Sequence, residues 1–365
     1  MKVKGKIMGT HDDAQILYVD APSKQYAITI NHDWIDHALF KRLTEERRIV
    51  VITDENVHAL YADLLEGIDV FIIKAGEASK CLSVYGQIQT YLIEKNLTRT
   101  DAVVALGGGV VGDLAGYVAA TYMRGIGFIQ IPTSLLAMVD SSVGGKVAIN
   151  HGVGKNIIGT FYQPDAVYID TAFLKTLPDK ERSCGFAEVI KYGLISDRAL
   201  FDQLTHMEAP KWQERIKDII YRCCEIKAEI VSKDEEDKGL RQILNFGHTI
   251  GHAVESYYHY SGYAHGEGVA IGMYMKAKMA YATKKISKED LKAVEVVLKK
   301  FNLPLQIREM SDWPRVLKEV IHDKKAEGKM FRLIELVRIG ETEMVSYTYE
   351  TLLERLGEIE NKEMV

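Results

Sequence analysis

Three histidines and a glutamate in the second half of the chain combine residue types and spacing that suit a divalent metal ion. His248 and His252 lie four residues apart, so a helix would present both on one face. His265 follows in H-G-E-G, and Glu188 lies in G-F-A-E-V-I-K-Y-G. Two imidazoles and a carboxylate with one open position make a catalytic zinc site. A lone histidine is usually an ordinary surface or core residue, but glycines that let backbones approach favour a metal site here. His252 could be a ligand or a substrate contact.

A glycine-rich turn in the first half has the composition of a phosphate-binding loop. In G-G-G-V-V-G-D, Gly107, Gly109 and Gly112 satisfy the G-x-G-x-x-G spacing. Backbone N–H groups at a helix N-terminus bind anions, which suits a pyrophosphate. The turn follows roughly the third strand of the alternating pattern, however, and no acidic residue ends the next strand to hold a ribose. Asp54, at the end of an earlier strand, could supply that carboxylate. The alternative is a tight turn selected only for packing.

Isolated cationic side chains occur in apolar or glycine-rich surroundings along the chain. Removing a charge from water is costly unless a permanent anion is to be bound. A phosphate and a carboxylate would both suit such positions, whereas the simpler alternative is one ion pair for each cation. The candidates, with one neighbouring asparagine, are Lys146, Lys155, Asn156, Lys191, Lys227, Arg241 and Lys324.

The segments that must position these groups alternate between strand and helix from about residue 48. Residues 5–30 before them alternate polar and apolar side chains, which predicts a hairpin or two edge strands. Alternating strands and helices predict a parallel sheet covered on both faces, with ligands at the carboxyl ends of its strands. Those ends carry the polar clusters D-E-N, A-G-E, G-G-G and P-T-S.

After F-L-K-T-L-P-D-K the strand pattern stops and helical spacing predominates, with one small strand pair predicted near residues 331–348. We therefore expect an α/β N-terminal domain with a mostly parallel, Rossmann-like sheet over residues 1–178. A mainly α-helical C-terminal domain is expected over residues 179–365, where the metal and substrate would bind.

Composition restricts the class of protein. The chain has 365 residues, 46 Lys plus Arg against 51 Asp plus Glu, and a formal net charge of −5, which argues against nonspecific nucleic-acid binding. No apolar run approaches the length of a membrane helix, and the first residues contain no secretory h-region. The four cysteines include no C-x-x-C pair, which favours reduced thiols. We expect a cytoplasmic protein that binds neither nucleic acid nor membrane.

Eight segments in one order, between about residues 48 and 340, resemble the 3-dehydroquinate synthase family of sugar phosphate cyclases. They are A-G-E-A-S-K, G-G-G-V-V-G-D-L-A-G, R-G-I-G-F-I-Q-I-P-T-S, V-D-S-S-V-G-G-K, G-K-N-I-I-G-T-F-Y-Q-P, F-L-K-T-L-P, F-A-E-V-I-K-Y-G and N-F-G-H-T-I-G-H-A-V-E. Two departures are Ser134, where the family usually has Thr, and Gly268, where Ala is common. We expect neither to disturb the site.

The resemblance also implies which residues bind the metal, the cofactor and the substrate. It implies zinc, with cobalt as an alternative, on Glu188, His248 and His265. It implies NAD on Asp54, Glu77, Lys80, Gly109, Val110, Val111, Gly112, Asp113, Thr133, Ser134, Lys146, Lys155, Phe173, Leu174, Lys175 and Thr176. It implies a phosphorylated sugar acid on Asp140, Lys146, Asn156, Lys191, Lys227, Arg241, Asn245, His252 and Lys324. Family members are usually homodimers, in which Arg124 would reach the neighbouring subunit's site.

The implied activity is that of a phosphate-eliminating carbon–oxygen lyase of the shikimate pathway. It converts 3-deoxy-arabino-heptulosonate 7-phosphate to 3-dehydroquinate and phosphate by transient oxidation with NAD, β-elimination, re-reduction and an intramolecular aldol closure. Three alternatives remain: a sister cyclase of secondary metabolism, a metal-dependent polyol phosphate dehydrogenase, and an inactive scaffold. The dehydrogenases typically lack D-S-S-V-G-G-K followed by G-K-N, whereas the sister cyclases usually change residues near Asp140–Lys146 and Arg241. A phosphate-release assay distinguishes the scaffold.

Overall fold

The computed structural model describes residues 13–152, 154–208, 211–259, 262–309, 313, 315–316, 330–348, 350–352 and 354–355. Lys324 and the beginning of the predicted 5–30 hairpin lie outside the described residues. The chain divides into two compact units. Unit 1 comprises Met1–Leu177 and Ile216–Glu236, and unit 2 comprises Pro178–Arg215 and Asp237–Val365.

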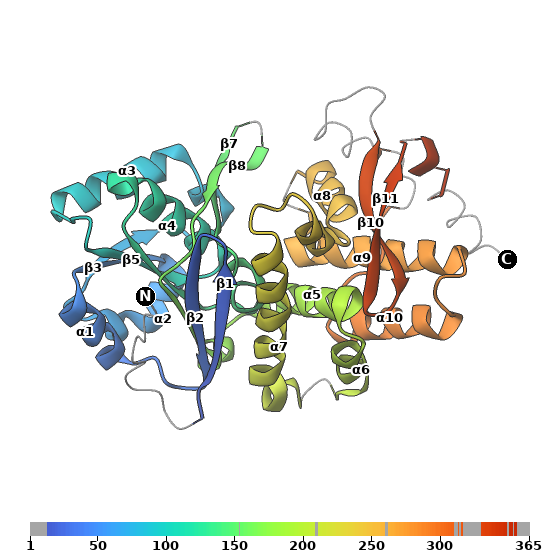
Figure 1. The fold of residues 1–365 in the computed structure, drawn as a ribbon, viewed down its shortest axis with the longest axis horizontal. Coiled ribbons are helices and arrows are strands. Elements are labelled where there is room, and N and C mark those ends of the chain that lie inside the picture. The colour runs from blue at the N-terminus through green and yellow to red at the C-terminus, as the bar shows by residue number, and fades with distance from the viewer. Residues whose placement is uncertain are drawn as a thin grey trace. The chain divides into compact units, whose positions relative to one another are not determined.

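Unit 1 is built on a seven-stranded sheet in the order β1-β2-β9-β6-β5-β3-β4 (Figure 1). Every neighbouring pair is parallel except β1 and β2, which form an antiparallel hairpin. The predicted mostly parallel sheet is therefore confirmed. The strands are β1 (Gln15–Ala21), β2 (Lys24–Asn31), β3 (Ile49–Asp54), β4 (Asp69–Ile73), β5 (Ala102–Gly107), β6 (Gly127–Pro132) and β9 (Ala166–Asp170).

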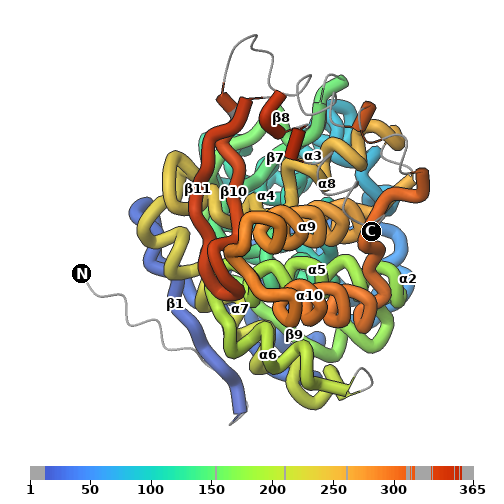
Figure 2. The backbone as a smooth tube through the Cα atoms, turned by 90° about the vertical axis from the view of Figure 1, so that its right-hand side faces the viewer, coloured from blue at the N-terminus to red at the C-terminus, as the bar shows by residue number. Residues whose placement is uncertain are grey.

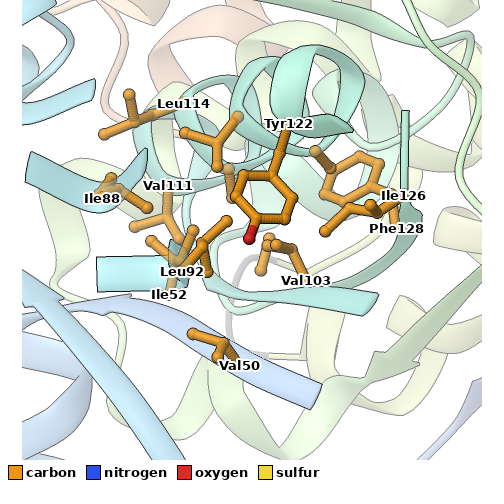
Figure 3. Close-up of a cluster of buried hydrophobic side chains, with 14 of the residues drawn as sticks. Val50, Ile52, Ile88, Leu92, Val103, Val111, Leu114, Tyr122, Ile126 and Phe128 are labelled. Atoms are coloured by element: carbon orange, nitrogen blue, oxygen red, sulfur yellow. The ribbon is translucent and has the colours of Figure 1, made fainter. Parts of the chain in front are cut away.

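The central strands are apolar along their whole length because both faces of the sheet are covered. In β5 every residue is buried, and in β3 every residue before Asp54 is buried. The covering helices are α1 (His37–Glu46), α2 (Glu55–Tyr61), α3 (Leu82–Glu94) and α4 (Gly109–Thr121). Figure 3 shows part of the core between α4 and the sheet, which includes Val111 and Leu114 of α4 and Val103 and Phe128 of the strands.

A second hairpin, β7 (Lys146–His151) with β8 (Gly154–Phe161), packs against α4. It carries three of the candidate residues, Lys146, Lys155 and Asn156. The sequence does not predict this hairpin as a pair of strands because most of β8 is exposed and lacks an alternating pattern.

Unit 2 is mainly helical, as predicted, and α9 (His265–Ala282) is its central element. This helix packs against α5 (Asp179–Ser196), α8 (His248–Tyr257), α10 (Lys288–Lys300) and β10 (Figure 2). Unit 2 also contains α6 (Arg198–His206), the 3₁₀ helix Leu240–Asn245 and the antiparallel hairpin of β10 (Phe331–Arg338) and β11 (Glu341–Tyr347). Among the described residues, no helix has both the length and the apolar character that crossing a membrane requires.

The division into units differs from the predicted boundaries in one segment. Helix α7 (Trp212–Lys233) begins in unit 2, but residues from Ile216 onward belong to unit 1, whereas the sequence predicts all of it in the second domain. The contacts explain this assignment. The Cys224 thiol donates to the Met138 carbonyl at 3.3 Å, and the Glu235 carboxylate accepts from the Ser23 backbone N–H at 2.9 Å.

One buried carboxylate anchors the chain where β9 ends. Asp170 accepts backbone hydrogen bonds from Asp33 and Ala172 on Oδ1 and from Trp34 and Ile35 on Oδ2, at 2.7–2.9 Å. It thereby ties the segment after β2 to the short 3₁₀ helix Thr171–Lys175. That helix contains most of the 173–176 segment that the family resemblance assigns to NAD.

Replacing Asp170 with alanine should lower the free energy of unfolding by about 3 kcal/mol, because four backbone N–H groups, two of them buried, would lose their acceptor. Chemical denaturation measures this change. The exposed Asp63 is the control, and its alanine variant should stay within about 0.5 kcal/mol of wild type. Equal stability of the two variants would contradict the anchoring role.

Candidate active site

Unit 2 brings the predicted metal ligands together. Glu188 lies in the middle of α5, His248 is the first residue of α8, and His265 is the first residue of α9. The Nε2 atoms of both histidines lie 3.6 Å from the same atom, Oε1 of Glu188. Each of the three residues offers a donor atom within 4.8 Å of the others. The donor set, two imidazoles and one carboxylate, is that of a catalytic zinc site.

The other nitrogen of each imidazole is held by a hydrogen-bond acceptor. His265 Nδ1 lies 3.0 Å from Oε1 of Glu255, a buried carboxylate, and His248 Nδ1 lies 3.2 Å from the Phe246 carbonyl oxygen. Metal-binding histidines generally donate their second N–H to a carboxylate or a carbonyl, which fixes the tautomer and the ring orientation. Both rings therefore present Nε2 toward Glu188, and the residues fit a divalent ion.

The two oxygens of Glu188 have different neighbours. Oε2 forms an ion pair with the ammonium of Lys191, three residues later on α5, while Oε1 faces the two imidazoles. Glu188 is 0% exposed and Lys191 is 1% exposed. A carboxylate buried so completely needs cationic partners. Lys191 is one such partner, and a divalent ion facing Oε1 would be a second.

The two histidines have opposite pKa shifts. Burial and the nearby Lys191 cation lower the pKa of His248 to about 3, so its ring is neutral at physiological pH. Burial alone would lower the pKa of His265, but the nearby carboxylates of Glu188 and Glu255 outweigh it and raise the pKa to about 10. In the metal-free protein His265 therefore carries the proton that a metal ion would displace.

Glycines allow the three helices to approach this closely. A Cβ at Gly251 would lie 2.8 Å from the backbone of Gly268, one at Gly266 would lie 2.4 Å from Cys184 Cα, and one at Gly272 would lie 2.0 Å from the Gly247 oxygen. These distances are shorter than any side chain tolerates, so α9 meets α5 and α8 through backbone. Alanine is common in the family at Gly268, but a Cβ there would lie 2.9 Å from the Gly251 oxygen. Here the backbones approach more closely than alanine allows without a shift.

His252 lies beside the three ligands but differs from them in exposure. Its ring centroid is 5.5 Å from that of His248 and 5.8 Å from that of His265, and its side chain is exposed. A second set of donors, His252, Glu255 and His265, also satisfies the distances of a metal site. We favour Glu188, His248 and His265 because the His265–Glu255 bond then serves as the support of a ligand. The substrate contact of His252 stays a prediction.

In unit 1 the glycine turn lies at the point where the strand order reverses. From β5 the chain proceeds to β6 on one side, whereas β3 and β4 lie on the other side. Ligands of open parallel sheets bind outside the strand ends at such a reversal. Strands β3 and β5 pair directly, with Thr53 opposite Leu106, so Asp54 and Gly107 end neighbouring strands. The carboxylate that the glycine motif lacks in sequence is thus next to it in the sheet.

The glycines of the turn meet different constraints. A Cβ at Gly107 would lie 2.6 Å from Val111, so this position requires glycine for packing alone. Gly108 and Gly109 face the hydroxyls of Ser134 and Ser141, at 3.4 and 3.2 Å from where a Cβ would lie. Helix α4 begins at Gly109. The turn thus combines a packing role with a helix N-terminus suited to a phosphate.

Asp54 and Ser134 each have a local structural role. Asp54 caps α2, and its Oδ1 accepts from the backbone N–H groups of Asn56 and Val57 at 2.9 and 3.0 Å. The Ser134 oxygen accepts from the backbone N–H of Ala137 at 3.3 Å, which keeps the hydroxyl that the family's threonine would supply.

Lys80 connects several predicted residues in one polar network. Its ammonium, only 3% exposed, donates to Asp113 Oδ2 at 2.6 Å and to Asn156 Oδ1 at 2.5 Å, and lies 3.6 Å from Glu77 Oε1. Burial raises the pKa of Asp113, and the Lys80 cation opposes this effect. The predicted cofactor residues Glu77, Lys80 and Asp113 and the predicted substrate residue Asn156 are therefore neighbours.

A separate ion pair joins Lys227 to Asp140, which lies in a π-helical turn over Ala137–Ser141. The Lys227 ammonium also donates to the Asp140 backbone oxygen at 2.7 Å. Turns of this kind are frequent at functional sites.

The remaining predicted residues differ in exposure. In unit 1, Phe173 and Leu174 are buried, whereas the exposed residues are Lys146, Lys155, Lys175, Thr176 and Arg124. Arg124 has a left-handed backbone, with φ of 67°, between Met123 and Gly125, which also have positive φ. In unit 2, Arg241 is 1% exposed and Asn245 is exposed. Lys324 lies outside the described residues.

Three polar residues in and around the site were not predicted from the sequence: Glu255, Asn150 and Asp170. Glu255 has a signal, since it lies three residues after His252 and seven after His248, on the same face of α8. Asn150 and Asp170 have none, because most of their partners are distant in sequence and no periodicity marks them.

Comparison with known proteins identifies one protein family along most of the chain. The family models for the N-terminal and C-terminal domains of 3-dehydroquinate synthase match residues 70–184 and 185–326. A 3-dehydroquinate synthase of Clostridium acetobutylicum is 47% identical over 312 residues, which cover 82% of this chain and 86% of that protein.

Two solved structures share the fold at a TM-score of 0.81. One is a 2-deoxy-scyllo-inosose synthase complexed with carbaglucose-6-phosphate, NAD+ and Co2+, 25% identical and covering 94% of this chain and 99% of its own. The other is a 2-epi-5-epi-valiolone synthase from Streptomyces hygroscopicus with NAD+ and Zn2+ bound, 24% identical and covering 92% of this chain and 97% of its own.

Replacing Glu255 with alanine should weaken divalent-metal binding about 10- to 100-fold, because His265 would lose the acceptor that orients its ring. Titration of the metal-free protein with Co2+, followed by visible absorption, measures the affinity. Glu267→Gln is the control, since Glu267 lies two residues after His265 but accepts from the Ala264 backbone N–H instead. Undiminished affinity in Glu255→Ala, or metal binding that survives Glu188→Gln but not Glu255→Gln, would contradict this assignment.

Metal binding near pH 8 should release about one proton from His265, whose pKa of about 10 keeps the metal-free ring protonated, and none from His248, whose pKa is about 3. Affinity should therefore rise with pH up to about 10 and then level off. Calorimetry in two buffers of different ionisation enthalpy counts the protons. Heats that do not depend on the buffer would contradict a protonated His265.

Proposed function

The chain belongs to the 3-dehydroquinate synthase family, and on that premise we propose that it converts 3-deoxy-arabino-heptulosonate 7-phosphate to 3-dehydroquinate and phosphate. The observation that carries this proposal is that the imidazoles of His248 and His265 converge on one oxygen of the fully buried Glu188 carboxylate. The second nitrogen of each ring contacts a hydrogen-bond acceptor, either the Phe246 carbonyl or Glu255. An inactive scaffold would have no need for so costly an arrangement.

Sequence identity favours this substrate over those of the sister cyclases. The chain is 47% identical to a 3-dehydroquinate synthase but 25% identical to a 2-deoxy-scyllo-inosose synthase of the same fold. The Asp140–Lys227 pair and the intact D-S-S-V-G-G-K and G-K-N segments support the same choice over a polyol phosphate dehydrogenase.

We propose NAD and zinc as the cofactors, with cobalt as an alternative metal, in line with the NAD+ and Co2+ or Zn2+ of the two solved structures. Glu188, His248 and His265 would hold the metal. The residues around the glycine turn, Asp54 and Lys80 would hold the dinucleotide. When bound, these groups supply a reversible hydride acceptor and a Lewis acid for the substrate's alcohol and ketone.

The chain's own cations would bind the substrate's phosphate and carboxylate. Arg241 is permanently charged and almost fully buried, so its guanidinium would interact with a dianion far more strongly than a solvated one. Lys191 is buried and forms an ion pair with Glu188, and its ammonium is proposed to stabilise the leaving phosphate. Lys146 and His252 are proposed to share that role, and Lys227 is positioned by Asp140.

Holding both ends of one substrate is also what the final ring closure requires. An intramolecular aldol step gains most of its rate when the reacting carbons are held in a near-attack geometry. Asn156, Asn245 and Lys324 are proposed to contribute to this orientation. The leaving phosphate can itself accept the proton of the elimination step, so no separate general base has to be assigned.

We further propose that the protein acts in the cytoplasm as a homodimer, with Arg124 reaching the site of the second copy. None of the four cysteines, Cys81, Cys184, Cys223 and Cys224, forms a disulfide, as expected for thiols in a reducing compartment. The exposed left-handed turn at Arg124 supports a contact outside its own subunit.

The test is an assay that follows phosphate and 3-dehydroquinate from the heptulosonate phosphate, with and without a chelator. We expect equal amounts of both products, many turnovers for each bound NAD, and loss of activity with the chelator. Glu188→Gln should lose metal and turnover together, by more than about 100-fold. Glu181→Gln, an exposed carboxylate on the same helix, should stay near wild type. NADH that accumulates in step with product, or a fully active metal-free enzyme, would contradict the proposal.

A further inference from the structure

Asn150, near the end of β7, makes one hydrogen bond with each of three residues around the Lys80 network. Its side-chain Nδ2 donates to Glu77 Oε1 at 2.8 Å, and its Oδ1 accepts from the Asn156 backbone N–H at 2.8 Å. Its own backbone N–H donates to the Lys80 carbonyl oxygen at 2.7 Å. No other described residue contacts Glu77, Lys80 and Asn156 through hydrogen bonds in this way.

The chemistry of the partners fixes the orientation of both amides. A backbone N–H can only donate, so the Asn150 atom that meets it must be the carbonyl oxygen, and the amino group then faces the Glu77 carboxylate. An ammonium can only donate as well, so the Asn156 atom that meets Lys80 must be Oδ1. Asn156 is exposed and therefore presents its amino group as a donor. If either amide were flipped, its amino group would face another donor, which is the Asn156 backbone N–H for Asn150 and the Lys80 ammonium for Asn156.

The local backbone needs such a support. The register of β7 and β8 is regular up to Ile149 opposite Ile158, then shifts before His151 opposite Gly154. Asn150 therefore lies opposite the extra residues of β8, which include Asn156. The Asn156 backbone is left-handed, with φ of 56°, a conformation that costs free energy in a residue other than glycine. Bulges of this kind re-aim side chains near active sites.

We propose that Asn150 is a positioning residue that links the cofactor residues Glu77 and Lys80 to the substrate residue Asn156. This inference rests on the proposed function, because it uses the roles assigned there to these three residues. A neutral amide is required at this position. An aspartate could still accept the hydrogen bond from the Asn156 backbone N–H but would place a carboxylate against that of Glu77. An alanine would lose the side-chain hydrogen bonds to both Glu77 and Asn156.

The test compares Asn150→Ala, Asn150→Asp and wild type, with NAD affinity measured without substrate and KM measured at saturating NAD. Asn150→Ala should raise both the Kd for NAD and the substrate KM about tenfold, the effect of losing one hydrogen bond to a charged or strained partner. Asn150→Asp should raise the Kd for NAD similarly but change KM less than about twofold. His151→Ala, an exposed neighbour on β7, is the control and should change neither.

Two further measurements separate positioning from general loss of structure. In an Asn156→Gly background, Asn150→Ala should raise KM by less than about threefold, because its effect on substrate passes through Asn156. Hydrogen exchange of the segment containing Asn156 should speed up in Asn150→Ala but not in Asn150→Asp. Unchanged exchange, or full additivity of the two substitutions on KM, would overturn the inference. A wild-type protein without turnover would contradict the proposed function instead, and the exchange measurement would still test the link.

Discussion

The candidate metal site depends on the approach of three helices at distances that no Cβ atom would permit. Gly251, Gly266 and Gly272 place backbone against backbone where α9 meets α8 and α5. Glycine inside a helix costs about 1 kcal/mol relative to alanine, so this packing is maintained against local propensity. It brings the first residues of α8 and α9 to the buried carboxylate of α5. Because Glu255 and the Phe246 carbonyl hold the second nitrogen of each imidazole, we propose that this polar cluster binds a cation.

In unit 1 the polar candidate residues are positioned by strands rather than by closely packed helices. Its candidate ligand-binding residues come from the carboxyl ends of parallel strands and from a hairpin that packs on α4. The apolar strands fix where each polar end lies, and the polar network of Lys80 then joins residues from separate segments. In both units the candidate site residues lie on short polar stretches whose positions are determined by buried, regular elements.

The sequence predicts much of this, for physical reasons that also explain what it misses. Buried strands such as β3 and β5 and the amphipathic α10 have clear periodicities, and the spacing of His248 and His252 follows from helical geometry. Residues most of whose partners are far away in sequence, such as Asn150 and Asp170, carry no periodic signal. The pairing of β3 with β5, which sets Asp54 beside the glycine turn, is likewise a property of sheet order. The transfer of residues 216–236 to unit 1 depends on contacts that composition does not reveal.

The most direct test of the central claim is the X-ray absorption spectrum of the zinc-loaded protein. Zinc on Glu188, His248 and His265 predicts two imidazole nitrogens at about 2.0–2.1 Å and carboxylate oxygen, with no sulfur. His248→Ala should then lose one imidazole from the spectrum. A sulfur shell, or two imidazoles retained in His248→Ala, would show that the ion is bound by other residues and would contradict the account.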